Sequence, residues 1–163
     1  MIRHILAFIL LAAGVHAATI WYLPRLAMNT AMSRLEAQGA GLNTFIHVPP
    51  TDETSRRVVR PSPDLLYSVC LLDLSEGPVQ IHVAGWGDYV SLSLFAGNTD
   101  NVFAVNESSG EGDIAVSVTN GDGADVDLGS ERGIAIVRRL APDAGRIAAA
   151  DAARRSGDLC EPE

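Results

Sequence analysis

The feature of this sequence that most constrains its structure is a long apolar run close to the first residue. From Ile5 to Leu23 every side chain is apolar except His16 and Thr19, and an arginine stands on each side of the run. At about 1.5 Å of helical rise per residue, the run is roughly 28 Å long, which matches the ~30 Å hydrocarbon core of a bilayer. The sequence therefore predicts a transmembrane anchor over residues 1–24.

A cleaved signal peptide is the alternative, because Val15-His16-Ala17 is an A-x-A-like cleavage site. The apolar run continues past that site through Trp21 and Tyr22, whose rings are typical of a membrane interface. This continuation favours a permanent signal anchor. Only a few residues precede the run, which is typical of signal anchors and predicts that the rest of the chain is exported.

Composition limits the classes of partner. About 140 residues follow the anchor, the length of one ordinary domain. The net charge is −8 and all twelve basic residues are arginines, so the chain lacks the attraction to phosphates that nucleic-acid binding uses. Between residues 61 and 131 there is no basic residue. Such an acidic stretch is typical of a solvated surface.

The chain has two cysteines, Cys70 and Cys160. In an oxidising compartment they are able to form a disulfide that closes a loop of about ninety residues. Two unpaired thiols are the alternative, since the distance between them does not follow from the sequence. Neither cysteine has a histidine or a second cysteine at ligand spacing, so no metal site is predicted.

After the anchor, Met28, Met32 and Leu35 repeat at helical spacing and glycines follow. This pattern predicts a juxtamembrane helix over residues 25–41. Residues 42–63 contain four prolines, three threonines and one asparagine, which indicates a linker or an irregular entry into the fold.

From residue 64 the hydrophobic period changes to two. Leu65 to Leu74 is apolar on both faces, and segments of alternating apolar and polar residues then recur about every ten residues, with Gly, Asn and Asp between them. The pattern predicts an all-β fold, an antiparallel, jelly-roll-like β-sandwich over residues 64–140. Pro142 and the run from Ala148 to Ala153 predict a short C-terminal helix and tail over residues 141–163.

No catalytic motif stands out. The exported part has two histidines, His47 and His82, and His82 is the better candidate for a base. Its alternation with Ile81 and Val83 places it on the solvent side of a strand, which favours a structural role. No catalytic residue and no cofactor are predicted.

One set of polar residues has the potential to form a ligand-binding site between sheet ends. Its members are Asp64, Tyr67, Asp73, Asn98, Asp100 and Asn101. The alternative is that their side chains bond to the backbone of turns.

Several segments resemble one bacterial family. They are Pro63-Asp64-Leu65-Leu66-Tyr67-Ser68, Leu72-Asp73-Leu74-Ser75-Glu76-Gly77-Pro78-Val79, Asp88-Tyr89-Val90-Ser91-Leu92 and Asn101-Val102-Phe103-Ala104-Val105. From about Arg60 to Leu140 the chain is similar to the domain of unknown function 1254, and its anchor resembles that of short membrane-anchored members. The resemblance implies a β-sandwich-like domain and no activity. Longer members carry a second β module, so a separate protein partner supplying that module is expected.

These observations favour an acidic, membrane-anchored cell-envelope protein with a non-catalytic β-domain that binds a protein partner or a small ligand. The expected location is the bacterial inner membrane, crossed once, with the β-domain on the periplasmic side. The alternatives are a structural assembly subunit and an envelope enzyme with a polar site around Asp64, Tyr67, Asp73 and the Asn98–Asn101 loop.

Overall fold

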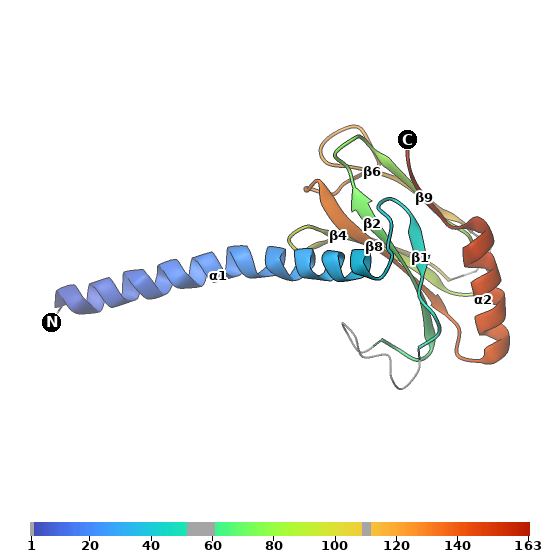
Figure 1. Cartoon of the computed structure of the whole chain (residues 1–163), viewed down its shortest axis with the longest axis horizontal. Coiled ribbons are helices and arrows are strands. Elements are labelled where there is room, and N and C mark those ends of the chain that lie inside the picture. Colours follow the sequence, from blue (N-terminus) through green and yellow to red (C-terminus); the bar gives the residue numbers. More distant parts are fainter. Residues whose placement is uncertain (1, 52–60, 109–111) are drawn as a thin grey trace.

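The computed structural model describes residues 2–51, 61–108 and 112–163, which form two helices and nine strands (Figure 1). The elements are α1 (Ile2–Ala37), β1 (Phe45–His47), β2 (Leu65–Asp73), β3 (Val79–Val83), β4 (Val90–Ala96), β5 (Asn101–Glu107), β6 (Ile114–Thr119), β7 (Val126–Asp127), β8 (Arg132–Leu140), α2 (Ala144–Gly157) and β9 (Leu159–Pro162).

The strands form two sheets that pack face to face. Sheet A has the order β1-β2-β8-β4-β5 and sheet B has the order β7-β6-β3-β9. Every strand pair is antiparallel except β6 with β7. Alternate residues of the strands fill the space between the sheets, as Leu72, Ile81, Leu92 and Val118 do. The fold is sandwich-like but not strictly all-β as predicted, because two helices complete it.

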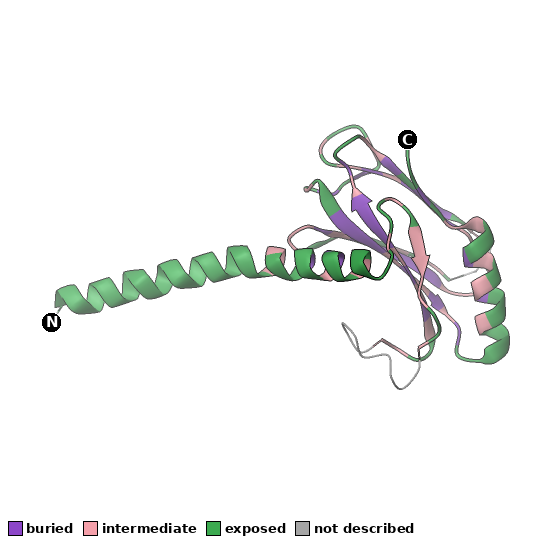
Figure 2. Cartoon of the chain, viewed as in Figure 1, coloured by how far each residue is buried: buried purple, intermediate pink, exposed green. Residues whose placement is uncertain are grey.

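Helix α1 contains one part that packs on the domain and one part that does not. The predicted anchor and juxtamembrane helix form a single helix that runs through Pro24. Met28 and Met32 are buried against Leu71 and Ile134 on the outer face of sheet A. Residues 2–23 of the helix are exposed (Figure 2). Among the described residues α1 is the one helix long and apolar enough to cross a membrane.

The path of α1 gives the domain two distinct sides. The C-terminal end of the helix is tied to sheet A by an ion pair between Glu36 and Arg132, and the segment after the helix by the bridge of Leu42 with Leu71. Figure 1 shows the apolar half of the helix leaving the domain on the side where β4 lies, with β1 and β9 on the opposite side.

Helix α2 covers one end of the sandwich. Asp143 caps it by accepting a hydrogen bond from the Arg146 N–H (2.9 Å), and Ala150 packs with Leu66 and Ala141. The chain then returns as β9, paired with β3. The C-terminal tail is therefore part of sheet B, and β1 lies within residues 42–63, where the sequence indicated a linker.

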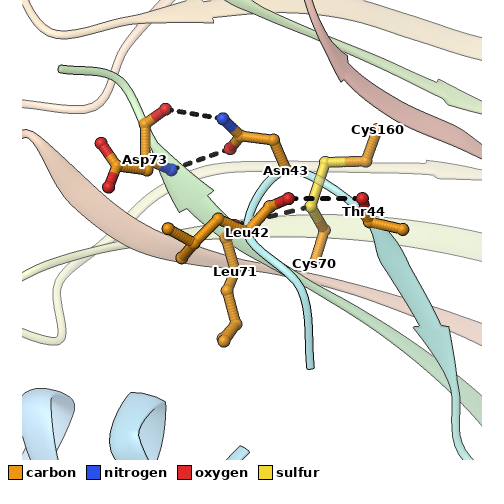
Figure 3. The surroundings of a disulfide bond; sticks show 7 residues. All are labelled: Leu42, Asn43, Thr44, Cys70, Leu71, Asp73 and Cys160. Carbon is orange, nitrogen blue, oxygen red and sulfur yellow. Dashed lines mark hydrogen bonds between the residues drawn. A yellow bond between two sulfur atoms is a disulfide. The ribbon is translucent and has the colours of Figure 1, made fainter. Parts of the chain in front are cut away.

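A disulfide joins Cys70 of β2 to Cys160 of β9, with the Cα atoms 6.6 Å apart (Figure 3). Of the two alternatives left open by the sequence, the structure has the bridge. It links sheet A to sheet B at the side of the sandwich where β1 and β9 lie.

Candidate functional site

The structure does not bring the six predicted polar residues together. Asp64 directly precedes β2, Tyr67 lies near its start, and Asp73 ends it. Nine steps along a strand separate Asp64 from Asp73 by roughly 30 Å. The turn at residues 98–101 lies between β4 and β5, near the end of sheet A that contains Asp73. The proposed polar pocket is therefore not assembled, and the enzyme alternative has no site there.

Most of these side chains make local hydrogen bonds instead. The Tyr67 hydroxyl accepts from the Ser62 N–H (3.0 Å). The Asp73 carboxylate accepts from the Ser75 hydroxyl (2.6 Å) and N–H (3.1 Å), and these bonds lower the pKa of Asp73. The Asn98 and Asp100 side chains bond to each other, and Asn98 also accepts from the Asp100 N–H. These are the turn-stabilising roles of the alternative reading.

The backbone of Asp73 has a further structural role. Its C=O and N–H both bond to the side chain of Asn43 at 2.8 Å, as Figure 3 shows. Asn43 has a φ of 49°, a left-handed conformation that asparagine tolerates better than most residues. This contact fixes the turn that leads from α1 into β1. Asn101 begins β5, where it pairs with Phe95.

A groove of about 430 Å³ lies between β1 and β9. One wall is formed by Leu42, Asn43, Thr44, Phe45 and His47, and the other by residues 158–162. Each wall is the edge strand of a different sheet. We call it the β1–β9 groove.

The backbone of β1 has unused hydrogen-bonding groups at this groove. The Val48 N–H donates to the Tyr67 carbonyl (2.9 Å). Bonded and non-bonded pairs alternate along an antiparallel ladder, so Ile46 also bonds toward β2, whereas the N–H and C=O of Phe45 and His47 point to the open edge. Strand β1 pairs with β2 alone among the described strands, so those groups have no backbone partner there.

The edge of β9 is less receptive. The Glu163 N–H donates to the Pro78 carbonyl (3.0 Å), so by the same alternation Glu161 bonds toward β3 while Cys160 and Pro162 face the open edge. Proline has no N–H, and charge or proline on an edge strand discourages pairing. In β9, therefore, Cys160 is the one residue with both a backbone N–H and a C=O directed to the open edge.

His47 stands in the groove next to a buried hydroxyl. Its Nδ1 lies 2.9 Å from the Ser68 Oγ. Burial is the main cause that lowers the pKa of His47, and the charge of Arg154 adds to it. A neutral imidazole beside a serine resembles a nucleophilic pair, but the Ser68 side chain is 1% exposed and does not line the groove. A ligand cannot reach that hydroxyl, so the pair orders β1 rather than attacking a substrate.

The lowered pKa of His47 predicts a pH dependence of stability. Between the folded pKa and the unfolded value near 6.5, the unfolded chain binds more protons than the folded chain, so stability falls as the pH falls through this range. We expect the denaturant midpoint of the wild-type chain to drop between about pH 7.5 and about pH 5. His47→Gln, which cannot titrate, is expected to show a smaller drop. Equal drops in the two proteins would contradict the assignment.

His82, which the sequence indicates as the better candidate for a base, does not line the groove. Its Nδ1 is 2.8 Å from the Gly157 carbonyl and its Nε2 is 3.2 Å from Asp113. It sits on the outer face of sheet B and connects the end of α2 to the loop before β6. Both ring nitrogens have partners, which supports the structural role.

A buried ion pair lies under the β9 wall. The Arg139 guanidinium donates to the Asp158 carboxylate at 2.5 and 2.8 Å, and the two side chains are 1% and 0% exposed. Arg139 also donates to the Ala84 carbonyl (2.8 Å), and Asp158 accepts from the Ala84 N–H (3.1 Å). The pair therefore connects β8, the end of β3 and the start of β9.

Arg154 of α2 supports the β1 wall in a similar way. It donates to the carbonyls of Val48 (3.0 Å) and Tyr67 (2.8 Å), and it pairs with Asp151. Burial lowers the pKa of Arg154, and the Asp151 carboxylate acts in the opposite direction. Both walls of the groove thus rest on buried arginines. Sequence reasoning missed this role for both arginines.

The rim of the groove is apolar. Outside α1, three large hydrophobic side chains among the described residues are exposed: Leu42 (44%), Val102 (40%) and Leu159 (51%). Leu42 and Leu159 line the groove, one on each wall. The groove therefore combines exposed apolar contact area with unpaired strand backbone.

Comparisons with known proteins give a family and a fold. The model of a family described as protein of unknown function (DUF1254) matches residues 42–159. The crystal structure of the VPA0106 protein from Vibrio parahaemolyticus is similar, with a TM-score of 0.65 and 16% identity over 88% of this chain and 36% of that chain. An uncharacterised Burkholderia cenocepacia protein has a TM-score of 0.45 and 18% identity over 69% of this chain and 36% of its own. No curated protein matches. The likeness to VPA0106 shows the fold alone, and this chain spans about a third of that protein.

Proposed function

Since this chain belongs to the DUF1254 family of unknown function, we propose a function from its own geometry: it is a single-span inner-membrane protein that presents a non-catalytic binding domain in the periplasm. The observation that carries the proposal is the division of α1. Its apolar N-terminal part is not buried against the domain, whereas its C-terminal part packs on sheet A through Met28 and Met32.

The surroundings of the apolar segment support this placement. Trp21 and Tyr22 stand at the end of the run, where aromatic residues favour a membrane interface, and the Arg25 guanidinium lies 4.4 Å from the centre of the Trp21 ring. The disulfide between Cys70 and Cys160 fits an oxidising compartment such as the periplasm.

The binding role is supported by the position of the β1–β9 groove. The groove lies on the side of the domain opposite the departing apolar helix, so it faces away from the membrane. The occupant we propose is a protein partner that carries a complementary β module. VPA0106, of which this chain covers 36%, is long enough to contain such additional structure within one chain.

Native mass spectrometry of the protein extracted in mild detergent from its own membrane tests this function. The expected result is the full-length chain, two hydrogen atoms lighter before reduction because of the disulfide, together with a second subunit. A mass that lacks residues 1–17 would show a cleaved signal peptide and overturn the anchor. A full-length chain without a second subunit would overturn the partner.

A further inference from the structure

We propose that the β1–β9 groove binds one extended segment of the partner, which pairs with the free edge of β1 and carries a basic side chain that meets Glu161. The inference rests on the proposed function and specifies how the partner is held. It makes the segment a sixth strand of sheet A.

The hydrogen-bonding groups of β1 are the first support. Phe45 and His47 each present an N–H and a C=O to the groove, as the ladder with β2 requires. An added strand satisfies both pairs of groups, and this mode of recognition is general for exposed sheet edges. Two successive outward residues suffice to set the register of a short segment.

The other edges of the sandwich are protected. Strand β9 carries Glu161 and Pro162, β5 has an irregular register with β4 between Leu94 and Phe95, and β7, the other edge of sheet B, is two residues long and includes Asp127. Prolines, charges and bulges are the usual devices against edge pairing. Residues 45–47 of β1 are Phe, Ile and His, with no proline and no acidic or basic charge at neutral pH, because the pKa of His47 is lowered.

The side chains of the groove define the occupant further. Leu42 and Leu159 are exposed on opposite walls, so alternate apolar side chains of an inserted strand gain contact with them. The Asp158 charge is compensated by Arg139. All residues that line the groove belong to the part of the chain that the structure describes. Of the charged residues among them, Glu161 is the one that forms no ion pair. Charge complementarity therefore calls for an arginine or lysine in the segment.

The test uses the full-length chain with its partner in its own membrane. His47→Pro removes an outward N–H without breaking the bonds of Ile46 and Val48 to β2. His47→Val is the matched control, because it also loses the contact with Ser68 but keeps the N–H. We expect the wild type and His47→Val to retain the second subunit, and His47→Pro to retain at least about tenfold less. Glu161→Lys is also expected to weaken retention, through charge repulsion.

A second measurement is independent of how well the proline variant folds. A photo-reactive amino acid is placed at Leu42, at Leu159 or, as a control on the far edge, at Val102. Cross-links from Leu42 and Leu159 to the same short segment of the partner, with none to that segment from Val102, are expected. Cross-links to lipid, to a second copy of this chain or to scattered partner sites would overturn the proposal.

The two proposals fail in different ways. If the wild-type chain brings no second subunit, the proposed function fails and this inference fails with it. If the subunit is present and His47→Pro keeps it with the stability of His47→Val, strand pairing at β1 is wrong while the binding function stands.

Discussion

Replacement of Asp158 by alanine is expected to lower the free energy of unfolding of the β-domain by about 3–5 kcal/mol. The reason is the guanidinium of Arg139, which is 1% exposed and has Asp158 as its ionic partner. Without the carboxylate, a positive charge remains buried without compensation, and the Ala84 N–H also loses its acceptor. Urea unfolding of the full-length chain in detergent, followed by tryptophan fluorescence with Trp21 replaced by phenylalanine in every variant so that Trp86 alone reports, measures the loss.

Two controls separate this effect from the loss of any carboxylate. Asp113→Ala removes an exposed carboxylate that pairs with His82 and is expected to cost much less. Combining Asp158→Leu with Arg139→Met replaces the ion pair by apolar groups and is expected to recover much of the stability. The recovery also has a local reason, because Arg139 Nε is buried with no hydrogen-bond partner among the described residues. A single variant as stable as Asp113→Ala would contradict the role of the pair.

Removal of the disulfide by Cys70→Ala with Cys160→Ala is expected to lower the free energy of unfolding by about 4 kcal/mol. The two cysteines are 90 residues apart in sequence, so the bridge restricts much of the unfolded chain. In the folded state it is also the covalent link between β9 and sheet A. Denaturant unfolding of the double variant against the oxidised wild type measures the effect.

The single variants Cys70→Ala and Cys160→Ala serve as matched controls, because each already breaks the bridge. Both are expected to lose nearly as much stability as the double variant. Hydrogen exchange adds a local readout, since the amides of β9 are expected to exchange faster in all three variants. A loss below about 1 kcal/mol, with unchanged exchange in β9, would show that pairing with β3 alone holds the tail.

The long strands could be predicted from the sequence because the order of apolar and polar residues along them shows which faces are buried. Residues 65–74 are apolar on both faces, and the structure covers β2 with the opposite sheet on one face and with Met28 and Met32 on the other. By contrast, β1 has three residues and β9 has four, too few to show a period. Their pairing is decided by the disulfide and by Arg139, Asp158 and Arg154, which are contacts between distant parts of the chain.

The candidate site was predicted less well for the same reason. Asp64 directly precedes β2, whereas Tyr67 and Asp73 belong to it, and the length of that strand separates Asp64 from Asp73. The groove is formed by two segments whose residue pattern does not indicate strands. His47 was therefore considered only as a possible base, with His82 preferred, and Asp158 was not identified. One usable signal was the position of Arg139, which falls on the same face of β8 as the buried Ala135 and Val137. A charge at a core position requires a buried partner.

Helix α1 continues without a break from its apolar part to the turns that pack on sheet A through Met28 and Met32, so the apolar part and the domain are joined by helix rather than by a loop. In the proposed membrane setting, the number of helical residues between Tyr22 and Met28 sets the height of the groove above the membrane. It also sets the direction in which the groove faces around the helix axis. Each residue of helix adds about 1.5 Å of height and about 100° of rotation. If the proposed partner is held in the same bilayer, it meets the groove at a constant height above the membrane, and its search for the groove is two-dimensional.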